Sequence, residues 1–210
     1  MAEGLVLDHV ILRRGGDLLL TLDARVAPGE VLTVMGRSGS GKSTLLSAII
    51  GQLDPAFTLE GRILLNGTDL TRRPAEARQV GILFQDDLLF PHLSVAGNLG
   101  FGLPRALRGA ARRTRIEAAL QEVELAGYGP RDPATLSGGQ KARVALMRML
   151  LAEPRALLLD EPFSRLDAGL RAQIRALVLA RAQARGLPVL LVTHDAEDAR
   201  AAGGRVVTLG

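Results

Sequence analysis

The sequence predicts an α/β fold built around a mostly parallel sheet, and two features of the chain indicate it. In the second half, the apolar runs 156–160, 188–194 and 205–209 alternate with segments of helical spacing, the longest being 167–185. In the first half, a glycine-rich loop at 36–41 joins an apolar run to a segment of helical spacing. Strands that alternate with helices imply a parallel sheet covered on both faces.

The elements before residue 85 follow from apolar runs bounded by turn residues. A helix over 43–53 should end near Gly51, because glycine commonly terminates helices. An Asn66-Gly67 turn should end the strand that begins at Glu60. The remaining predicted strands are 5–12, 18–26, 31–35 and 80–84.

The stretch 86–153 is predicted to be largely helical, with its clearest helical spacing at 115–125. No repeat, low-complexity tract or linker separates it from the rest of the chain. A length of 210 residues also suits one large domain. We therefore expect a single domain, 1–210, into which 86–153 is inserted as a helical subdomain.

Composition excludes several classes of protein. The net charge of +4 is too small to indicate a nucleic-acid partner, and none is expected. No apolar run approaches the roughly 18 residues of a membrane helix, and no secretory signal is visible, so residence in the cytosol is the default. The lack of cysteine excludes disulfides and thiolate metal sites.

The loop from Gly36 to Ser43 matches the pattern G-x-x-x-x-G-K-[ST] between a strand and a helix, which predicts a P-loop NTPase core. Glycines let backbone N–H groups approach phosphate oxygens, and the following helix adds partial positive charge. Lys42 would neutralise the β and γ phosphates of ATP, and the Ser43 hydroxyl would bind Mg²⁺. The residues expected to bind the nucleotide here are Gly36, Ser38, Gly39, Ser40, Gly41, Lys42, Ser43 and Thr44.

An acidic pair, Asp160 and Glu161, follows the apolar strand 156–160. Ligands of open α/β sheets bind at the carboxyl ends of strands. Asp160 is therefore a candidate Mg²⁺ ligand and Glu161 a candidate general base. Taken alone, such a pair is more often a helix cap or a solvated strand end.

A specific family resemblance begins at Leu136-Ser137-Gly138-Gly139-Gln140. Alone, this pentapeptide could be an ordinary helix start with Ser137 as its N-cap. With the P-loop before it, and Gln85, LLLDEP (157–162), Asp167 and His194 in order, nearly the whole chain resembles the ATPases of ABC transporters.

The resemblance implies an N-terminal antiparallel β subdomain, an inserted helical subdomain and a homodimer with two ATP molecules between its copies. Ser137, Gly139 and Gln140 would contact the nucleotide of the other copy, and Asp167 would bridge the subunits. Glu161 would be the general base and His194 would contact the γ-phosphate, with Gln85 as the third catalytic residue. Mg²⁺ would be held by Ser43, Gln85 and Asp160. A lone Gln, His or Asp at a strand end is more often a surface residue, so these roles depend on the family match.

The chain departs from the family after the first predicted strand. The family usually has an aromatic residue there that stacks on adenine, but this sequence has no Phe, Tyr or Trp before Phe57. Arg13 or Arg14 could stack on the base instead, which predicts weaker base selectivity than is usual in this family. The arginines at 105, 108, 112, 113 and 115 are either a solvated face or a contact to lipid headgroups.

The segment 84–103 resembles the part of importer ATPases that receives the membrane subunit, so Phe90, Pro91 and Leu93 are either groove residues or internal packing. The chain is also similar to the small ATPases of thiamine, iron and polyamine importers. This implies permease subunits and a solute-binding protein as partners, and a peripheral location on the cytoplasmic face of the inner membrane. The alternatives are a soluble ABC ATPase acting on nucleic acid or ribosomes, and the ATPase of an exporter.

Overall fold

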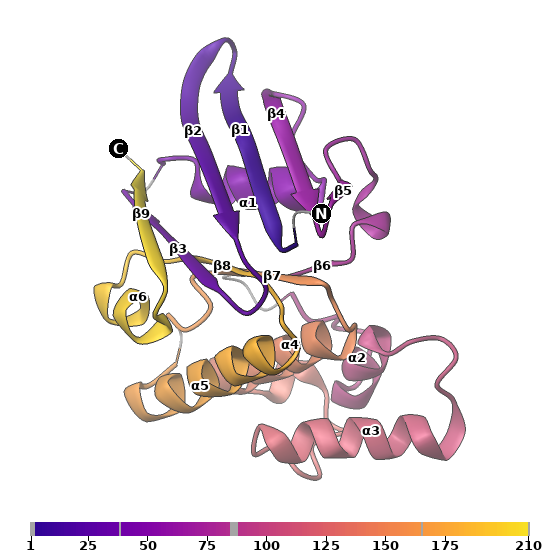
Figure 1. The fold of residues 1–210 in the computed structure, drawn as a ribbon. Coiled ribbons are helices and arrows are strands. Elements are labelled where there is room, and N and C mark those ends of the chain that lie inside the picture. Colours follow the sequence, from indigo (N-terminus) through magenta and orange to yellow (C-terminus); the bar gives the residue numbers. More distant parts are fainter. Residues whose placement is uncertain (1–2, 38, 85–87, 165, 210) are drawn as a thin grey trace. The chain divides into compact units, whose positions relative to one another are not determined.

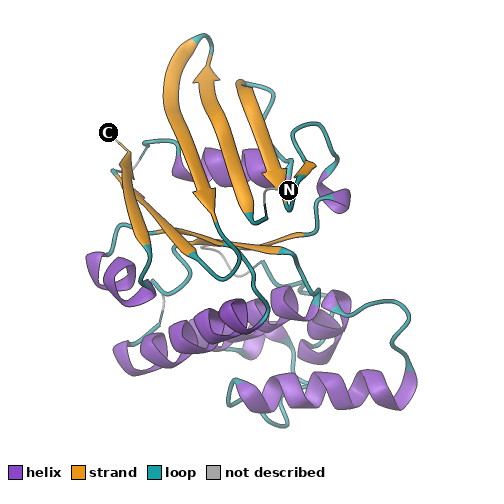
Figure 2. Ribbon diagram, in the orientation of Figure 1, coloured by secondary structure: helices purple, strands orange, loops and turns teal. Residues whose placement is uncertain are grey.

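The structure is a computed structural model that describes residues 3–37, 39–84, 88–164 and 166–209. The chain divides into two compact units. The first comprises residues 1–82, 155–161 and 177–210, and the second comprises 83–154 and 162–176. Figures 1 and 2 show the elements of each unit.

The first unit contains an antiparallel sheet in the order β2-β1-β4-β5. Its strands are β1 (Leu5–Arg14), β2 (Asp17–Val26), β4 (Phe57–Leu65) and β5 (Thr68–Asp69). Alternate residues of β1 are fully buried, as expected for a sheet with one face on the core. Asn66 and Gly67 both have positive φ, of 49° and 77°, so the predicted turn joins β4 to β5.

A second sheet has the order β6-β7-β8-β3-β9, and β7, β8, β3 and β9 are parallel neighbours. Its strands are β3 (Val31–Gly36), β6 (Val80–Leu83), β7 (Ala156–Asp160), β8 (Val189–Val192) and β9 (Arg205–Leu209). The apolar residues of β7 and β8 are buried, as strands covered on both faces require. The predicted parallel sheet is confirmed.

Helix α1 (Lys42–Ile50) follows β3 and is fixed at both ends. At its start, Gly41 has φ +87°, and a Cβ there would meet Leu20 of β2 at 2.8 Å. Gly51, with φ +83°, ends the helix as the sequence predicts. The buried guanidinium of Arg78 then donates hydrogen bonds to the carbonyls of Ala48 and Ile49, at 2.8 and 2.9 Å. Leu20 of β2 therefore packs at the start of the helix that carries Lys42, and Arg78 satisfies carbonyls at its end.

The second unit is built from α2 (Val95–Gly102), α3 (Gly109–Glu122) and α4 (Gly138–Leu151). The helix predicted at 115–125 starts earlier and ends at Glu122, because the chain turns at Glu124 with φ +57°. α5 (Ala168–Ala184) begins in this unit and ends in the first, and α6 (Ala196–Ala202) belongs to the first. Among the described residues, no helix has both the length and the apolar character to cross a membrane.

Candidate active site

Three neighbouring strands of the parallel sheet end at one edge. Val34 of β3 pairs with Val192 of β8, and Val192 pairs with Asp160 of β7. Val34, Val192 and Asp160 therefore lie side by side. The glycine-rich loop and His194 follow within two residues of Val34 and Val192, so they lie at the same edge as Asp160. Carboxyl ends of parallel strands are where ligands bind in such sheets.

The glycine-rich loop encloses a buried positive charge. The Lys42 ammonium donates to the carbonyls of Gly36 and Arg37, at 2.8 Å each. A Cβ on Gly36 would lie 2.7 Å from the Ser40 hydroxyl oxygen, so a side chain at position 36 would force the loop to shift. The buried Ser40 hydroxyl has no hydrogen-bond partner within the described part of the chain.

These features fit a phosphate group. Lys42 supplies charge, the Ser40 hydroxyl offers an unused donor, and the N-terminus of α1 points its N–H groups out of the helix. Thr44 is half-buried in the first turn of α1. Ser38, which the sequence also assigns to this loop, lies outside the described residues.

Ser43 and Asp160 meet across 117 positions of sequence. The Ser43 hydroxyl donates to Asp160 Oδ2 at 3.1 Å. Burial raises the pKa of Asp160, and the hydrogen bond from Ser43 acts in the opposite direction. A carboxylate beside a hydroxyl is a pair of oxygen ligands that suits Mg²⁺.

Glu161 and His194 form the second polar pair at this edge. His194 Nδ1 lies 2.8 Å from Glu161 Oε1, and the ring donates to the carboxylate in the tautomer that carries the proton on Nδ1. Glu161 has φ +46°, unusual for a residue with a side chain, and its N–H donates to the Val192 carbonyl at 2.9 Å. The carboxylate is thus held next to Asp160 by both its backbone and the imidazole.

In the second unit, Ser137 caps α4. Its hydroxyl accepts from the Gln140 N–H at 3.3 Å, while Gln140 Oε1 accepts from the Ser137 N–H at 3.0 Å. This capping box confirms that Ser137 is the N-cap of α4. Ser137 and Gly138 are exposed, and no atom of the described residues lies within 4 Å of a Cβ on Gly138, so this part of the chain leaves the N-terminus of α4 accessible to an anion.

Of the remaining predicted site residues, Asp167 is described by the structure and Gln85 is not. Asp167 stands before α5, and its Oδ1 accepts from the Leu170 N–H at 3.0 Å, which is an N-cap contact. Gln85 lies outside the described residues. The structure therefore brings together Lys42, Ser43, Asp160, Glu161 and His194 within the first unit, and places Ser137, Gly139, Gln140 and Asp167 in the second.

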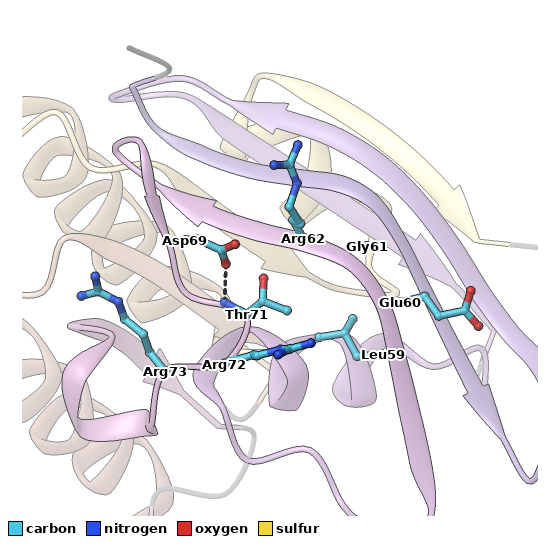
Figure 3. A pocket seen from close by; sticks show the side chains of 8 residues that line it. All are labelled: Leu59, Glu60, Gly61, Arg62, Asp69, Thr71, Arg72 and Arg73. Atoms are coloured by element: carbon cyan, nitrogen blue, oxygen red, sulfur yellow. Dashed lines mark hydrogen bonds between the residues drawn. The ribbon is translucent and has the colours of Figure 1, made fainter.

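The candidate base-stacking arginines both have partners in the antiparallel sheet. Arg13 Nε donates to Glu60 at 3.0 Å, and the Arg14 guanidinium lies 5.7 Å from the centre of the Phe57 ring. A separate hollow of about 630 Å³ lies over β4 and the turn after β5 (Figure 3). It is lined by Leu59, Glu60, Gly61, Arg62, Asp69, Thr71, Arg72 and Arg73.

Sequence reasoning missed Asn98, a fully buried amide in α2. Its Oδ1 accepts from the Phe90 N–H at 2.8 Å, and its Nδ2 is within 3.1–3.2 Å of the carbonyls of Phe90, Leu93 and Ser94. Arg148 lies over the Phe90 ring at 5.0 Å and donates to the Leu88 carbonyl. The only sequence signal was an amide inside an apolar stretch.

Asn98 and Arg148 fix a segment with exposed apolar side chains. Phe90 packs against Phe101 in a tilted arrangement, with ring centres 4.7 Å apart. Phe101 is nevertheless 68% exposed and Leu88 is 58% exposed. Exposed apolar groups mark an interaction surface where they form a contiguous patch, so Leu88 and Phe101 are candidates for such a surface.

Known proteins and a solved structure are similar to this chain over most of its length. A family model described as ABC transporter matches residues 19–164. Over 181 residues, 86% of this chain and 83% of the relative, the chain is 51% identical to "Uncharacterized ABC transporter ATP-binding protein YnjD" of Escherichia coli (strain K12). It is also 51% identical over 202 residues to "Thiamine import ATP-binding protein ThiQ" of Cereibacter sphaeroides, covering 96% of this chain and 86% of the relative.

Among solved structures, the fold matches the dimeric post-hydrolysis state of the ATP-binding cassette MJ0796 bound to ADP and Pi. The TM-score is 0.84 at 30% identity, and the match covers 98% of this chain and 94% of that one.

Proposed function

This chain belongs to the ABC transporter family as one of its ATP-binding ATPase domains, and from that premise we propose that it hydrolyses ATP to drive import of a small solute through separate membrane subunits. The observation that carries the proposal is the shared sheet edge. There, one row of strand ends brings the Lys42 loop, the Ser43–Asp160 pair and the Glu161–His194 pair together.

Each residue at this edge has a role in ATP hydrolysis that suits its chemistry. The loop and Lys42 bind the phosphates of ATP, and Ser40 adds a hydroxyl donor. The Glu161 carboxylate accepts the proton of the attacking water, and His194 orients that carboxylate and reaches the γ-phosphate.

Mg²⁺ would be held by Ser43 and Asp160, together with Gln85. When bound, the ion supplies positive charge that neutralises charge developing on the phosphates. The 3.1 Å contact between the Ser43 hydroxyl and Asp160 supports this assignment, because it gathers two oxygen ligands before any cation arrives.

The working form would be a homodimer with two ATP molecules between its copies. Ser137, Gly139 and Gln140 of one copy would contact the nucleotide of the other, and Asp167 would bridge the copies. The exposed N-terminus of α4 supports this role, since it is free to receive phosphate oxygens. The dimeric MJ0796 cassette, bound to ADP and Pi, is consistent with it.

Import rests on the similarity to ThiQ, which is named a thiamine import protein. We therefore place this chain on the cytoplasmic face of the inner membrane with permease subunits and a solute-binding protein as partners. The apolar surface of Leu88, Phe90 and Phe101 suits a short apolar segment of a permease. The same similarity favours this function over a soluble ATPase acting on nucleic acid or ribosomes, and over an exporter ATPase.

A pull-down from native membranes in mild detergent tests the proposal. The tagged chain should recover a multi-span membrane protein and a solute-binding protein, and the eluate should hydrolyse ATP. A Phe101→Asp variant tests the apolar surface separately, because it adds charge there and leaves the residues of the sheet edge unchanged. It should lose the membrane protein yet keep nucleotide binding. Recovery of ribosomes or DNA without any membrane protein would overturn the import function and leave the ATPase assignment standing.

A further inference from the structure

Strand β1 carries a bulge at Asp8 and His9. Leu7 pairs with Ala24 and Val10 pairs with Leu22, so Asp8 and His9 together face Asp23 of β2. In a regular strand, two consecutive side chains point to opposite faces of the sheet. The extra residue and the positive φ of His9, +49°, remove that alternation locally. As a result, three polar side chains gather at one point.

The gathered atoms are one imidazole nitrogen and two carboxylate oxygens. His9 Nδ1 lies 2.7 Å from Asp8 Oδ1 and 3.3 Å from Asp23 Oδ2. One such atom from each residue lies within 4.8 Å of the other two. Asp8 is the most enclosed of the three, with 28% of its side chain exposed, while His9 and Asp23 face solvent. A solute ion can therefore reach the cluster directly.

The neighbouring strand β4 is shaped to fit the bulge. Gly61 has φ +85°, and a Cβ there would collide with the carbonyl oxygens of His9 and Asp8. Beside it, Arg62 donates from Nε and Nη2 to Asp8 Oδ2, at 3.0 and 2.6 Å. Arg62 thus occupies one oxygen of Asp8 and leaves Oδ1 facing His9. Hydrogen bonds of this kind orient the ligands of metal sites.

We propose that Asp8, His9 and Asp23 bind a divalent transition-metal ion, with Zn²⁺ the best fit. An imidazole nitrogen with two carboxylate oxygens is a donor set that Zn²⁺ accepts, and three protein ligands leave a position for water. Ca²⁺ and Mg²⁺ fit less well, because both prefer about six or more oxygen ligands. The ion would tie β1 to β2 at the bulge, so its binding would stabilise the folded chain. The site is separate from the sheet edge and does not depend on the proposed function.

The test is a calorimetric titration of the full chain with ZnCl₂, after removal of any purification tag and without nucleotide. His9→Asn removes the imidazole yet keeps a residue type that tolerates positive φ. Asp23→Asn removes one carboxylate charge. His92→Asn is the matched control, because His92 is an exposed histidine that lies outside the cluster. His194→Asn reports on zinc held at the Glu161–His194 pair.

We expect saturable binding in the wild type and in the His92 and His194 variants, and at least tenfold weaker binding in the His9 and Asp23 variants. Zinc should also raise the thermal midpoint of the wild type and leave that of the His9 variant unchanged. Two results would overturn the proposal. One is an absence of saturable binding in the wild type, which would leave the cluster as an ion-paired histidine. The other is binding that survives in the His9 variant and disappears in the His194 variant.

Discussion

Replacement of Asn98 by Ala should destabilise the chain by an amount that the hydrogen bonds predict. The change removes the partner of the Phe90 N–H and of the Leu93 carbonyl. The Phe90 and Ser94 carbonyls retain backbone donors, the N–H groups of Leu93 and of residue 98. Each polar group left without a partner costs about 1–3 kcal/mol, so two cost about 2–6 kcal/mol. We expect about 3 kcal/mol, because the neighbouring residues 91 and 92 are exposed and water can reach part of the loop.

Urea unfolding followed by circular dichroism measures this loss, and the other asparagine of the chain provides the control. Asn66 accepts one hydrogen bond, from the Gly4 N–H at 2.8 Å, and has φ +49°. Asn66→Gly keeps that backbone conformation and should cost only about 1 kcal/mol. If the Asn98→Ala variant loses no more stability than the Asn66→Gly variant, the buried amide does not organise residues 88–94 and the reasoning fails.

Three further predictions concern other parts of the molecule. Glu161→Gln should keep ATP binding and lower turnover at least about a hundredfold, because the general base is lost; undiminished turnover in a phosphate-release assay would contradict that role. GTP and ATP should be hydrolysed at similar rates, since Arg13 and Arg14 stand where an aromatic residue is usual, and a strong preference for ATP would refute this. Gly102→Ala should cost about 1–3 kcal/mol, because a Cβ there would meet the Arg148 carbonyl of α4; an unchanged thermal midpoint would argue against that close packing.

The sequence pattern predicted strand bounds best where they do not depend on a neighbouring strand. The predicted strands 156–160 and 205–209 have the same bounds in the structure. β4, in contrast, begins at Phe57 and not at the predicted Glu60. Gly61 interrupts its pattern, and the reason for that glycine lies in β1, where the bulge at His9 needs the space. Periodicity along one strand cannot report such a requirement of its partner.

The same distinction applies to the functional residues. Lys42, Ser43, Asp160 and Glu161 belong to contiguous motifs, so the residue types and spacing predict their chemistry without a structure. Arg78 acts on carbonyls of α1, about 30 positions earlier in the chain, and Asn98 acts on backbone groups of the loop before α2. Neither residue belongs to a motif that predicts these contacts. All of these site assignments stay predictions, and Ser38 and Gln85 in addition lie outside the described residues.

Both polar clusters of the first unit arise where a strand loses its regular geometry. Asp160 and Glu161 are consecutive, and so are Asp8 and His9, so a regular strand would send the two side chains of each pair to opposite faces. In each pair the second residue has positive φ, +46° for Glu161 and +49° for His9. A side chain in that region costs about 1–3 kcal/mol unless the surroundings hold it there. The contacts differ accordingly: Val192 and His194 hold Glu161, whereas Gly61 makes room for the backbone of His9. Because strain of this size persists only where neighbouring residues enforce it, the bulge at His9 is as much a built feature of the fold as the edge at Glu161.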